Sequence, residues 1–209
     1  FKYLIFSGFI FHTIGLAFRW IASGHAPWSN GYESMIYTAW ATLLSGIIFS
    51  KKSNFTLSAT AIVGSLILMF ASMNWMDPTI TNLVPVLNSY WLMIHVAIIV
   101  ASYGFLFLGA ILGLMCLWII VFTNNENKKK LKSIINSLTN INERGITVGV
   151  FMLTIGTFLG GVWANESWGR YWGWDPKETW ALVSILVYAF VLHMRLIPAI
   201  SSKYSFNLA

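Results

Sequence analysis

Residues 89–122 read SYWLMIHVAIIVASYGFLFLGAILGLMCLWIIVF, an apolar run that contains no Lys, Arg, Asp or Glu. About 20 predominantly apolar residues are enough for a helix to cross the hydrocarbon core of a bilayer. At about 1.5 Å per residue this run would form a helix near 50 Å long, so we expect one end to project beyond the hydrocarbon. The stretch therefore predicts a long transmembrane helix.

Composition and further apolar runs extend this prediction to the whole chain. The 209 residues are 57% hydrophobic and only 10% charged, whereas soluble domains carry about 25% charged residues. We predict an all-α, polytopic transmembrane helix bundle with about six spans, the other five lying near 1–22, 31–50, 55–73, 145–164 and 176–197. Residues 1–122 should form the first four helices, with external loops near 23–30 and 74–88. A basic cytoplasmic connector is expected at 123–144. The last helix pair should lie in 145–197 and enclose an external segment at 163–180, and a cytoplasmic tail at 198–209 should lead toward a further span.

The positions of the basic residues predict how the chain is oriented in the membrane. If Lys2 lies on the inner side, ten of the thirteen Lys and Arg residues fall on that side, and only Arg19, Arg170 and Lys177 fall outside. This bias follows the positive-inside rule. Basic residues at span ends, and not on one soluble face, exclude a nucleic-acid partner. Cys116 is the only cysteine, so this chain provides no thiol–disulfide relay of its own.

The strongest functional signal is a cluster of tryptophans whose core reads WGRYWGWDPKETW at 168–180. Trp and Tyr favour the headgroup level of a membrane, which explains two or three of these rings. It does not explain their alternation with Gly169 and Gly173, which leaves room for a flat ligand. We interpret the segment as a platform for a large planar apolar ligand that carries charged groups. Its aromatic residues are Trp163, Trp168, Tyr171, Trp172, Trp174 and Trp180, and Trp91 of the fourth span is a further candidate for the same platform.

Two histidines are candidate axial ligands of an iron porphyrin. His95 lies near the outer end of the fourth span, one helical turn from Trp91 and at the depth of the tryptophan-rich segment. His193 follows Asp175 by 18 residues and so lies about 27 Å further inward along the sixth span. One porphyrin cannot contact both, so two ligands would mean two sites. Ionisable residues inside a membrane are costly and often functional, although packing at an interface is the alternative for each.

The charged residues of the outer loop allow more than one interpretation. Asp175 precedes Pro176 at the first helical position and Glu178 three residues later, which favours helix capping over acid–base chemistry. Arg170 and Lys177 are candidates to pair with carboxylates of the ligand, with headgroup contact as the alternative.

Two further histidines lie toward the N-terminus. His25 belongs to the segment SGHAPWSNGYE at 23–33, and we expect it to help line the external site. For His12, structural packing and function are equally good explanations.

The segment at 168–180 resembles the WWD domain of haem-handling proteins, which cytochrome c biogenesis systems I and II share. The ending KETW, together with SGHAPWSNGYE at 23–33 and FHT at 11–13, is similar to the CcsA/ResC type of system II. The likeness covers most of the chain and extends to the fused form, in which such a chain is the C-terminal part of a CcsBA cytochrome c synthase.

The resemblance implies a cytochrome c synthase subunit that exports haem b and presents it outside the bacterial inner membrane. There the two thiols of an apocytochrome c Cys-x-x-Cys-His motif add to the haem vinyl groups. On this resemblance His95 is the first external axial histidine, and His193 is the transmembrane histidine that follows the WWD segment. The resemblance places the second external histidine after a further span, which this chain lacks, and the partner of His193 in a CcsB/ResB subunit or fused half.

Three other functions are compatible with parts of the pattern. A system I protein of the CcmC type would deliver haem without ligating it. A b-type electron-transfer anchor would need histidine pairs at matched depth, which His95 and His193 do not provide. A transporter or channel without haem is disfavoured by the scarcity of intramembrane charge.

Overall fold

The computed structural model describes residues 1–209 apart from 52, 74–75, 81–88, 124 and 198–209, and gives the backbone alone for 125–130. The predicted all-α class is confirmed, and the predicted tail at 198–209 lies outside the described residues. In these residues the chain forms six α-helices and a short 3-10 turn: α1 (Lys2–Ser23), α2 (Gly31–Phe49), α3 (Asn54–Ser72), α4 (Tyr90–Phe122), α5 (Asn125–Trp168), α6 (Pro176–His193) and η2 (Met194–Leu196).

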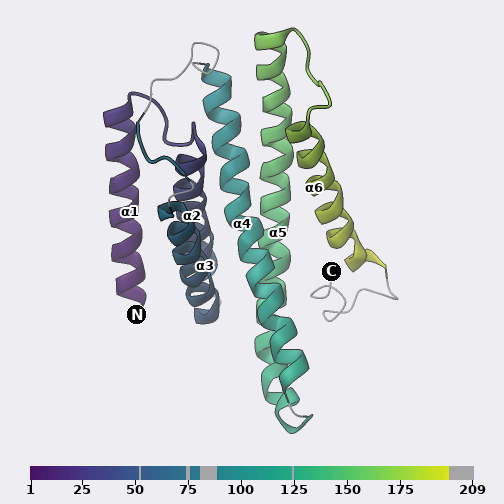
Figure 1. The fold of residues 1–209 in the computed structure, drawn as a ribbon. Helices are drawn as coiled ribbons and strands as arrows, with labels where there is room; N and C mark the ends of the chain where they lie inside the picture. Colours follow the sequence, from purple (N-terminus) through teal and green to yellow (C-terminus); the bar gives the residue numbers. More distant parts are fainter. Residues whose placement is uncertain (52, 74–75, 81–88, 124, 198–209) are drawn as a thin grey trace.

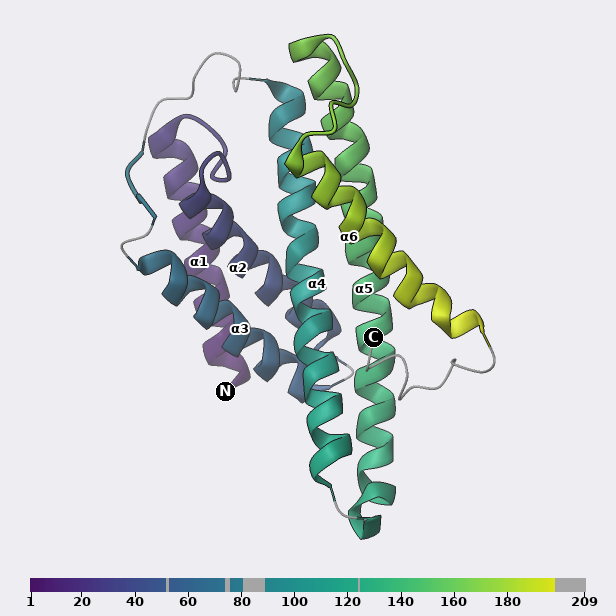
Figure 2. The same cartoon turned by 45° about the vertical axis from the view of Figure 1, so that its right-hand side comes forward.

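The helices run alternately up and down, with the N-terminus at the lower end of α1 (Figure 1). As a result, the loops that follow α1 and α5 lie at the upper end of the bundle. Helices α4 and α5 continue below the other helices, and Figure 2 shows them side by side along their length. The 33-residue length of α4 agrees with the projecting helix expected from its sequence. The fold thus places the segment around 24–30 and the tryptophan-rich segment at one end.

Of the six helices in the described part of the chain, five are long and apolar enough to cross a membrane, and α2 is the exception. Helix α2 buries polar side chains, among them Glu33, Thr38, Thr42 and Ser45. The hydroxyl of Thr38 donates to the Ser34 carbonyl over 2.7 Å, and that of Thr42 donates to the Thr38 carbonyl over 2.8 Å. Such bonds to the preceding turn satisfy hydroxyl groups inside an apolar bundle. The chain is therefore a multi-pass helical membrane protein in which α2 is held among its neighbours.

Helix α5 joins two regions that the sequence separates. Its 44 residues include both the basic stretch at 125–144 and the apolar stretch at 145–164. At its upper end the helix continues to Trp168, so the loop before α6 begins at Gly169. Helical continuity matters for the site because it places Trp163 and Trp168 on a rigid element.

Two buried clusters hold α4 against its neighbours. In the first, Leu108, Leu112 and Cys116 of α4 pack with Ala59 of α3 and with Leu138 and Ile141 of α5. The second joins Leu106 of α4 to α5 and to Val191 of α6. Helices α2 and α4 approach closely at Gly104, where a Cβ atom would lie 2.6 Å from the Ala41 carbonyl carbon. Small residues at such crossings allow the backbone contact that drives helix association in membranes.

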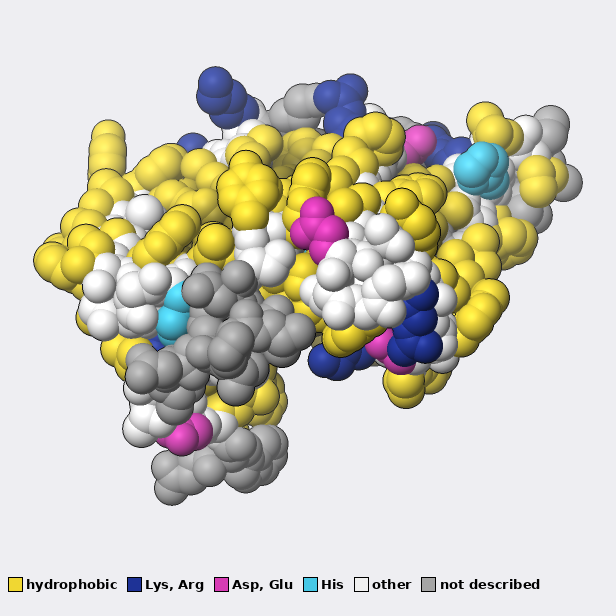
Figure 3. All heavy atoms as spheres, turned by 90° about the horizontal axis from the view of Figure 1, so that it is seen from above, with side chains coloured by type: hydrophobic (Ala, Val, Ile, Leu, Met, Phe, Trp, Pro, Cys, Tyr) yellow, Lys and Arg dark blue, Asp and Glu magenta, His cyan; other side chains and the backbone are white. Residues whose placement is uncertain are grey.

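Large apolar side chains also cover the outside of the bundle. Phe11 of α1 and Phe158 of α5 are 73% and 75% exposed. Seen from the upper end, hydrophobic side chains occupy much of the described surface and the charged side chains gather in small groups (Figure 3). An apolar exterior of this kind suits a bilayer as the surrounding solvent.

Candidate functional site

The tryptophan-rich loop is shaped by hydrogen bonds at both of its ends. The Gly169 N–H donates to the Asn165 carbonyl over 2.8 Å and closes α5 with a left-handed φ of 71°, which glycine adopts without a Cβ clash. At the other end, Asp175 Oδ1 accepts from the Glu178 N–H over 2.8 Å. The Glu178 carboxylate reaches back to accept from the Gly173 N–H over 2.7 Å. Asp175 therefore caps α6, as its sequence pattern predicts.

A cavity of about 930 Å³ lies between the upper parts of α4, α5 and α6. The loop after α1 contributes one side of it through Trp28 and Ser29, and the turn before α6 contributes another. Its volume lies near the top of the range of about 300–1,000 Å³ typical of small-molecule sites. Eight of the residues proposed from sequence line it: His95, Trp163, Trp168, Tyr171, Trp172, Asp175, Lys177 and Trp180.

His95 is held in one orientation within this cavity. Its side chain is buried, and its Nδ1 atom lies 2.8 Å from the Trp91 carbonyl oxygen. A carbonyl oxygen only accepts hydrogen bonds, so Nδ1 carries the proton and Nε2 keeps its lone pair. The imidazole stacks on Trp163, with ring centroids 5.5 Å apart and planes at 28°. A backbone carbonyl on one ring nitrogen is the usual support for a histidine that binds metal through the other.

Glycine at position 160 provides the space that the imidazole occupies. A Cβ atom built on Gly160 would lie 3.2 Å from His95 Cδ2 and 3.7 Å from Nε2. Contacts of 3.2 Å between carbon atoms are closer than the 3.5–4.0 Å optimum for dispersion. The side chain of His95 therefore packs directly against the backbone of α5.

The indole N–H groups of Trp163 and Trp172 are unusual donors at this site. Both nitrogen atoms are buried, and within the described part of the chain neither has a hydrogen-bond partner. Buried donors are rarely left unpaired in proteins. Trp163 meets Trp168 edge to face at 4.7 Å, and Trp172 meets Trp174 in the same way at 5.7 Å. The two N–H groups fit a ligand that brings acceptor atoms into the cavity.

Three of the other proposed residues, Trp174, Arg170 and Trp91, lie outside the cavity lining. The ring of Trp174 is 69% exposed, and its φ of 56° is uncommon for a bulky side chain. The guanidinium of Arg170 packs over the backbone of Gly173, where a Cβ atom would lie 2.9 Å from Arg170 Cζ. The ring of Trp91 meets Tyr90, while its carbonyl serves His95.

The other two histidines proposed as site residues, His25 and His193, are also outside the cavity. His25 is buried in the loop after α1, and its Nδ1 lies 3.2 Å from the Ala26 carbonyl oxygen and 3.2 Å from Ser29 Oγ. His193 is exposed at the opposite end of α6, and its Nδ1 lies 2.7 Å from the Ala189 carbonyl oxygen. Next to it, Arg195 pairs with Glu143 of α5 over 3.3 Å. The structure thus separates His193 from the cavity that contains His95.

Sequence reasoning missed the part played by Trp28. Its indole N–H donates to the Met93 carbonyl of α4 over 3.0 Å, and its ring contacts those of Trp20 and Tyr37 at 5.5 Å and 4.8 Å. Trp28 belongs to the motif at 23–33, from which the sequence analysis proposes only His25 as a residue of the site. Its signal was an aromatic residue two positions before the N-cap Asn30, at the end of the bundle that bears the tryptophan-rich loop.

Comparison with known proteins identifies the family. The profile described as "Cytochrome C assembly protein" matches residues 28–209. The chain is 48% identical over 200 residues to protein NrfI of Wolinella succinogenes, covering 96% of this chain and 22% of that protein. It is 42% identical over 191 residues to the cytochrome c biogenesis protein CcsA of Chlamydomonas reinhardtii, covering 87% of this chain and 53% of that protein.

A third relative is the cytochrome c biogenesis protein CcsA of Prochlorococcus marinus strain SARG, 36% identical over 225 residues, which cover 93% of this chain and 71% of that protein. The chain thus spans about a fifth of NrfI and about half of the algal CcsA. The profile match includes α2 to α6 and every residue that lines the cavity. The chain belongs to the family of cytochrome c assembly proteins.

Proposed function

We propose that the cavity holds haem b and presents it for covalent attachment to apocytochrome c. The observation that carries this proposal is His95, whose Nδ1 is bonded to the Trp91 carbonyl and whose ring lies in a cavity walled by tryptophans. Histidine is the usual proximal ligand of haem iron. The family to which the chain belongs, and the biogenesis role in the names of its relatives, support the same cofactor.

The residues present fit haem in size, shape and charge. Aromatic side chains from α5 and from the loop before α6 give flat apolar walls on which a porphyrin can lie. The unpaired indole N–H groups of Trp163 and Trp172 supply donors, and Lys177 supplies a cation. Haem carries two carboxylates that need such partners, because buried charge is costly without them.

Attachment would depend on orientation rather than on a nucleophile from this chain. Haem supplies two vinyl groups, to which the thiols of the Cys-x-x-Cys-His motif add as thioethers. His95 would fix the iron and the tryptophans would fix the ring plane, so that one edge stays open to the incoming peptide. Cys116 is buried in the core between α4 and α5, well away from the cavity. The chain would therefore act as part of a cytochrome c synthase, together with a CcsB/ResB-type partner.

The proposal also includes a direction and a second haem position. The bias of Lys and Arg toward the lower end supports placing the cavity at the outer face of a bacterial inner membrane. His193, at the opposite end of α6, would hold haem at an earlier stage of export. Its Nδ1 also bonds a backbone carbonyl, which gives it the same tautomer as His95.

The test is the absorption spectrum of the full-length protein purified with its partner subunit. Wild type should retain haem with a histidine-ligated spectrum. His95→Ala should lose most of it, and added imidazole should restore the ligation. If wild type binds no haem, or if His95→Ala leaves the spectrum unchanged, the proposed site is wrong.

Coexpression with an apocytochrome c then separates ligation from delivery alone. A synthase yields cytochrome whose haem stays attached after denaturation, because thioether bonds are covalent. A protein of the delivery type yields none without additional ligation proteins. Haem that is bound but never attached would contradict the synthase role and leave the haem site standing.

A further inference from the structure

One wall of the cavity comes from the short loop between α1 and α2, and its contacts reach the helix that carries His95. Trp28 and Ser29 both line the cavity. The indole N–H of Trp28 donates to the carbonyl of Met93, two residues before His95 in the first turns of α4. Trp28 therefore lines the cavity and also binds the backbone of the first turns of α4. The Trp91 carbonyl, which orients the imidazole of His95, belongs to the same turns.

A buried carboxylate holds this loop in place. Glu33, in the first turn of α2, is fully buried. Its Oε2 accepts from the Ser29 hydroxyl over 2.6 Å and from the Ser29 N–H over 2.9 Å. Its Oε1 accepts from Arg19 Nε of α1 over 2.9 Å. One carboxylate thus links α1, the first turn of α2 and the cavity wall.

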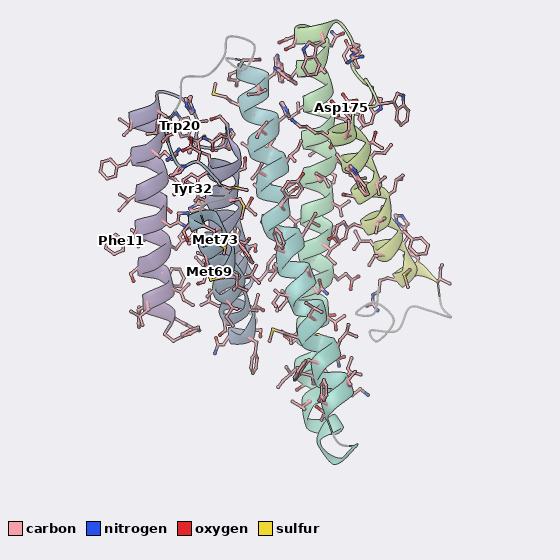
Figure 4. The ribbon with its side chains drawn as sticks, viewed as in Figure 1. Phe11, Trp20, Tyr32, Met69, Met73 and Asp175 are labelled. Carbon is pink, nitrogen blue, oxygen red and sulfur yellow. The ribbon has the colours of Figure 1, made fainter. Side chains whose placement is uncertain are left out.

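The surroundings of this link lie at the cavity's end of the bundle. Figure 4 shows Trp20 of α1 and Tyr32 of α2 together at the upper end, where Asp175 opens α6. The Arg19 guanidinium lies 5.1 Å from the centre of the Tyr32 ring, and a further Arg19 nitrogen donates to the Pro78 carbonyl over 3.0 Å. Contacts with Tyr32 and Pro78 therefore hold the Arg19 side chain, which contacts the carboxylate through Nε.

Helix capping alone does not account for Glu33. The cap of α2 is already made by Asn30, whose Oδ1 accepts from the Glu33 N–H over 2.8 Å. A glutamate at this position that only assisted the cap would remain solvated, because burying a carboxylate costs several kcal/mol unless it is paired. Here the carboxylate is buried, and its hydrogen bonds from Arg19 and Ser29 offset this cost and at the same time hold the loop in one conformation.

We propose that Glu33 is a positioning residue, which acts through Ser29 and Trp28 to fix the cavity wall and the orientation of His95. The proposal rests on the cavity being a haem site. It concerns a residue that does not line the cavity and that touches neither haem nor the thiols. Loss of the carboxylate would free the loop, so that Trp28 would leave the Met93 carbonyl and His95 would lose its single orientation.

The test is a double-mutant cycle on haem affinity in full-length protein depleted of haem and titrated with haem in detergent. Glu33→Gln and Trp28→Phe should each raise the haem dissociation constant by about tenfold, which lies within the range of coupling energies between contacting residues. The double variant should bind haem no more weakly than the weaker single variant, because the two residues act as one unit. Asn30→Ala is the matched control, since it removes a cap at the same helix terminus and should leave haem affinity unchanged.

The outcomes distinguish this inference from the haem site itself. If wild type binds no haem, both proposals fail. If wild type binds haem and Glu33→Gln binds it equally well, or if the two single effects multiply in the double variant, only the positioning role is wrong.

Should Glu33→Gln fail to fold, Ser29→Ala keeps the Arg19–Glu33 pair and tests the same link. It should raise the haem dissociation constant severalfold, and an unchanged value would overturn the proposal.

Discussion

His95 of α4 and Trp163 of α5 lie in stacking contact, with ring centroids 5.5 Å apart and planes at 28°. The contact joins the candidate iron ligand to the helix that leads into the tryptophan-rich loop. Because α4 and α5 also share two buried clusters, the pair is held by rigid elements on both sides. Stacking on Trp163 and the bond to the Trp91 carbonyl together fix the plane of the imidazole.

Replacing Trp163 tests whether this stacking supports haem binding. Trp163→Leu should bind haem more weakly than Trp163→Phe by about 0.5–1.5 kcal/mol, the range measured for aromatic pairs, because both variants lack the indole N–H and only phenylalanine can stack on His95. Haem titration of the purified variants gives the values. Phe158→Leu on the same helix is the control, since Phe158 is exposed on the outside of the bundle. Equal losses in Trp163→Leu and Phe158→Leu would show that the stacking has no specific role.

A methyl group at position 160 should disturb the iron ligand directly. The Cβ of Gly160→Ala would lie 3.2 Å from His95 Cδ2, so the imidazole or the helix must shift by a few tenths of an ångström. We expect a mixed ligation state in the absorption spectrum, with the protein still folded. Gly15→Ala is the matched control, because a Cβ there has nothing within 4 Å. Identical spectra for the two variants would contradict the packing of His95 against Gly160.

Helix capping and acid–base chemistry at Asp175 make different predictions. As a cap, Asp175 accepts one hydrogen bond from the Glu178 N–H, and an asparagine oxygen can replace it. Asp175→Asn should therefore keep both stability and haem attachment. Asp175→Ala should lower the free energy of unfolding by about 1 kcal/mol. Thermal unfolding in detergent and the yield of attached cytochrome measure the two effects. Loss of attachment in Asp175→Asn at unchanged stability would show a protonation role.

The two basic residues of the loop should differ in importance. Lys177 lines the cavity, whereas Arg170 packs over the Gly173 backbone outside it. A charge-assisted hydrogen bond contributes about 1.5–3 kcal/mol, so Lys177→Gln should weaken haem binding by roughly tenfold or more. Arg170→Gln should have a small effect. The comparison is made by haem titration at low and high salt, because screening should reduce the Lys177 contribution. The reverse order of effects would place the haem carboxylates on the Arg170 side.

Much of this architecture follows from the sequence because it depends on local signals. Long apolar runs predicted the helices, and the Asp175-Pro176 pair marked the start of α6, where Asp175 does cap. The depth of His95 relative to the tryptophans also followed from counting residues along helices of known rise. The sequence contains the polar residues of α2, but their burial depends on the packing of α2 against α3 and α4, which the sequence does not indicate.

The cavity wall could not be predicted because it depends on how distant segments meet. Trp28 contacts α4 across 65 residues of chain, and no periodicity within the loop indicates that partner. Similarly, Trp91 shares a helix face with His95, yet it contributes its carbonyl and not its ring to the site. His25 and Trp28 are three residues apart, and only the fold decides which of them reaches the cavity. Side-chain direction in irregular loops follows from tertiary contacts and not from sequence spacing.

The separation of His95 and His193 leads to a prediction about stoichiometry. His193 lies 18 residues beyond Asp175, which corresponds to about 27 Å along α6, and it is absent from the lining of the described cavity. Sites more than about 10 Å apart that share no partners respond independently to mutation. With the partner subunit present, His193→Ala that is supplied with haem from the outside should therefore lose one haem signal and keep the His95 signal unchanged, and the double variant should show the sum of both losses. Haem is supplied from the outside because haem exported through His193 would reach His95 only after it. Pyridine haemochrome quantification together with the absorption spectrum measures this. Loss of the His95 signal in His193→Ala under these conditions would mean that the two histidines serve one site.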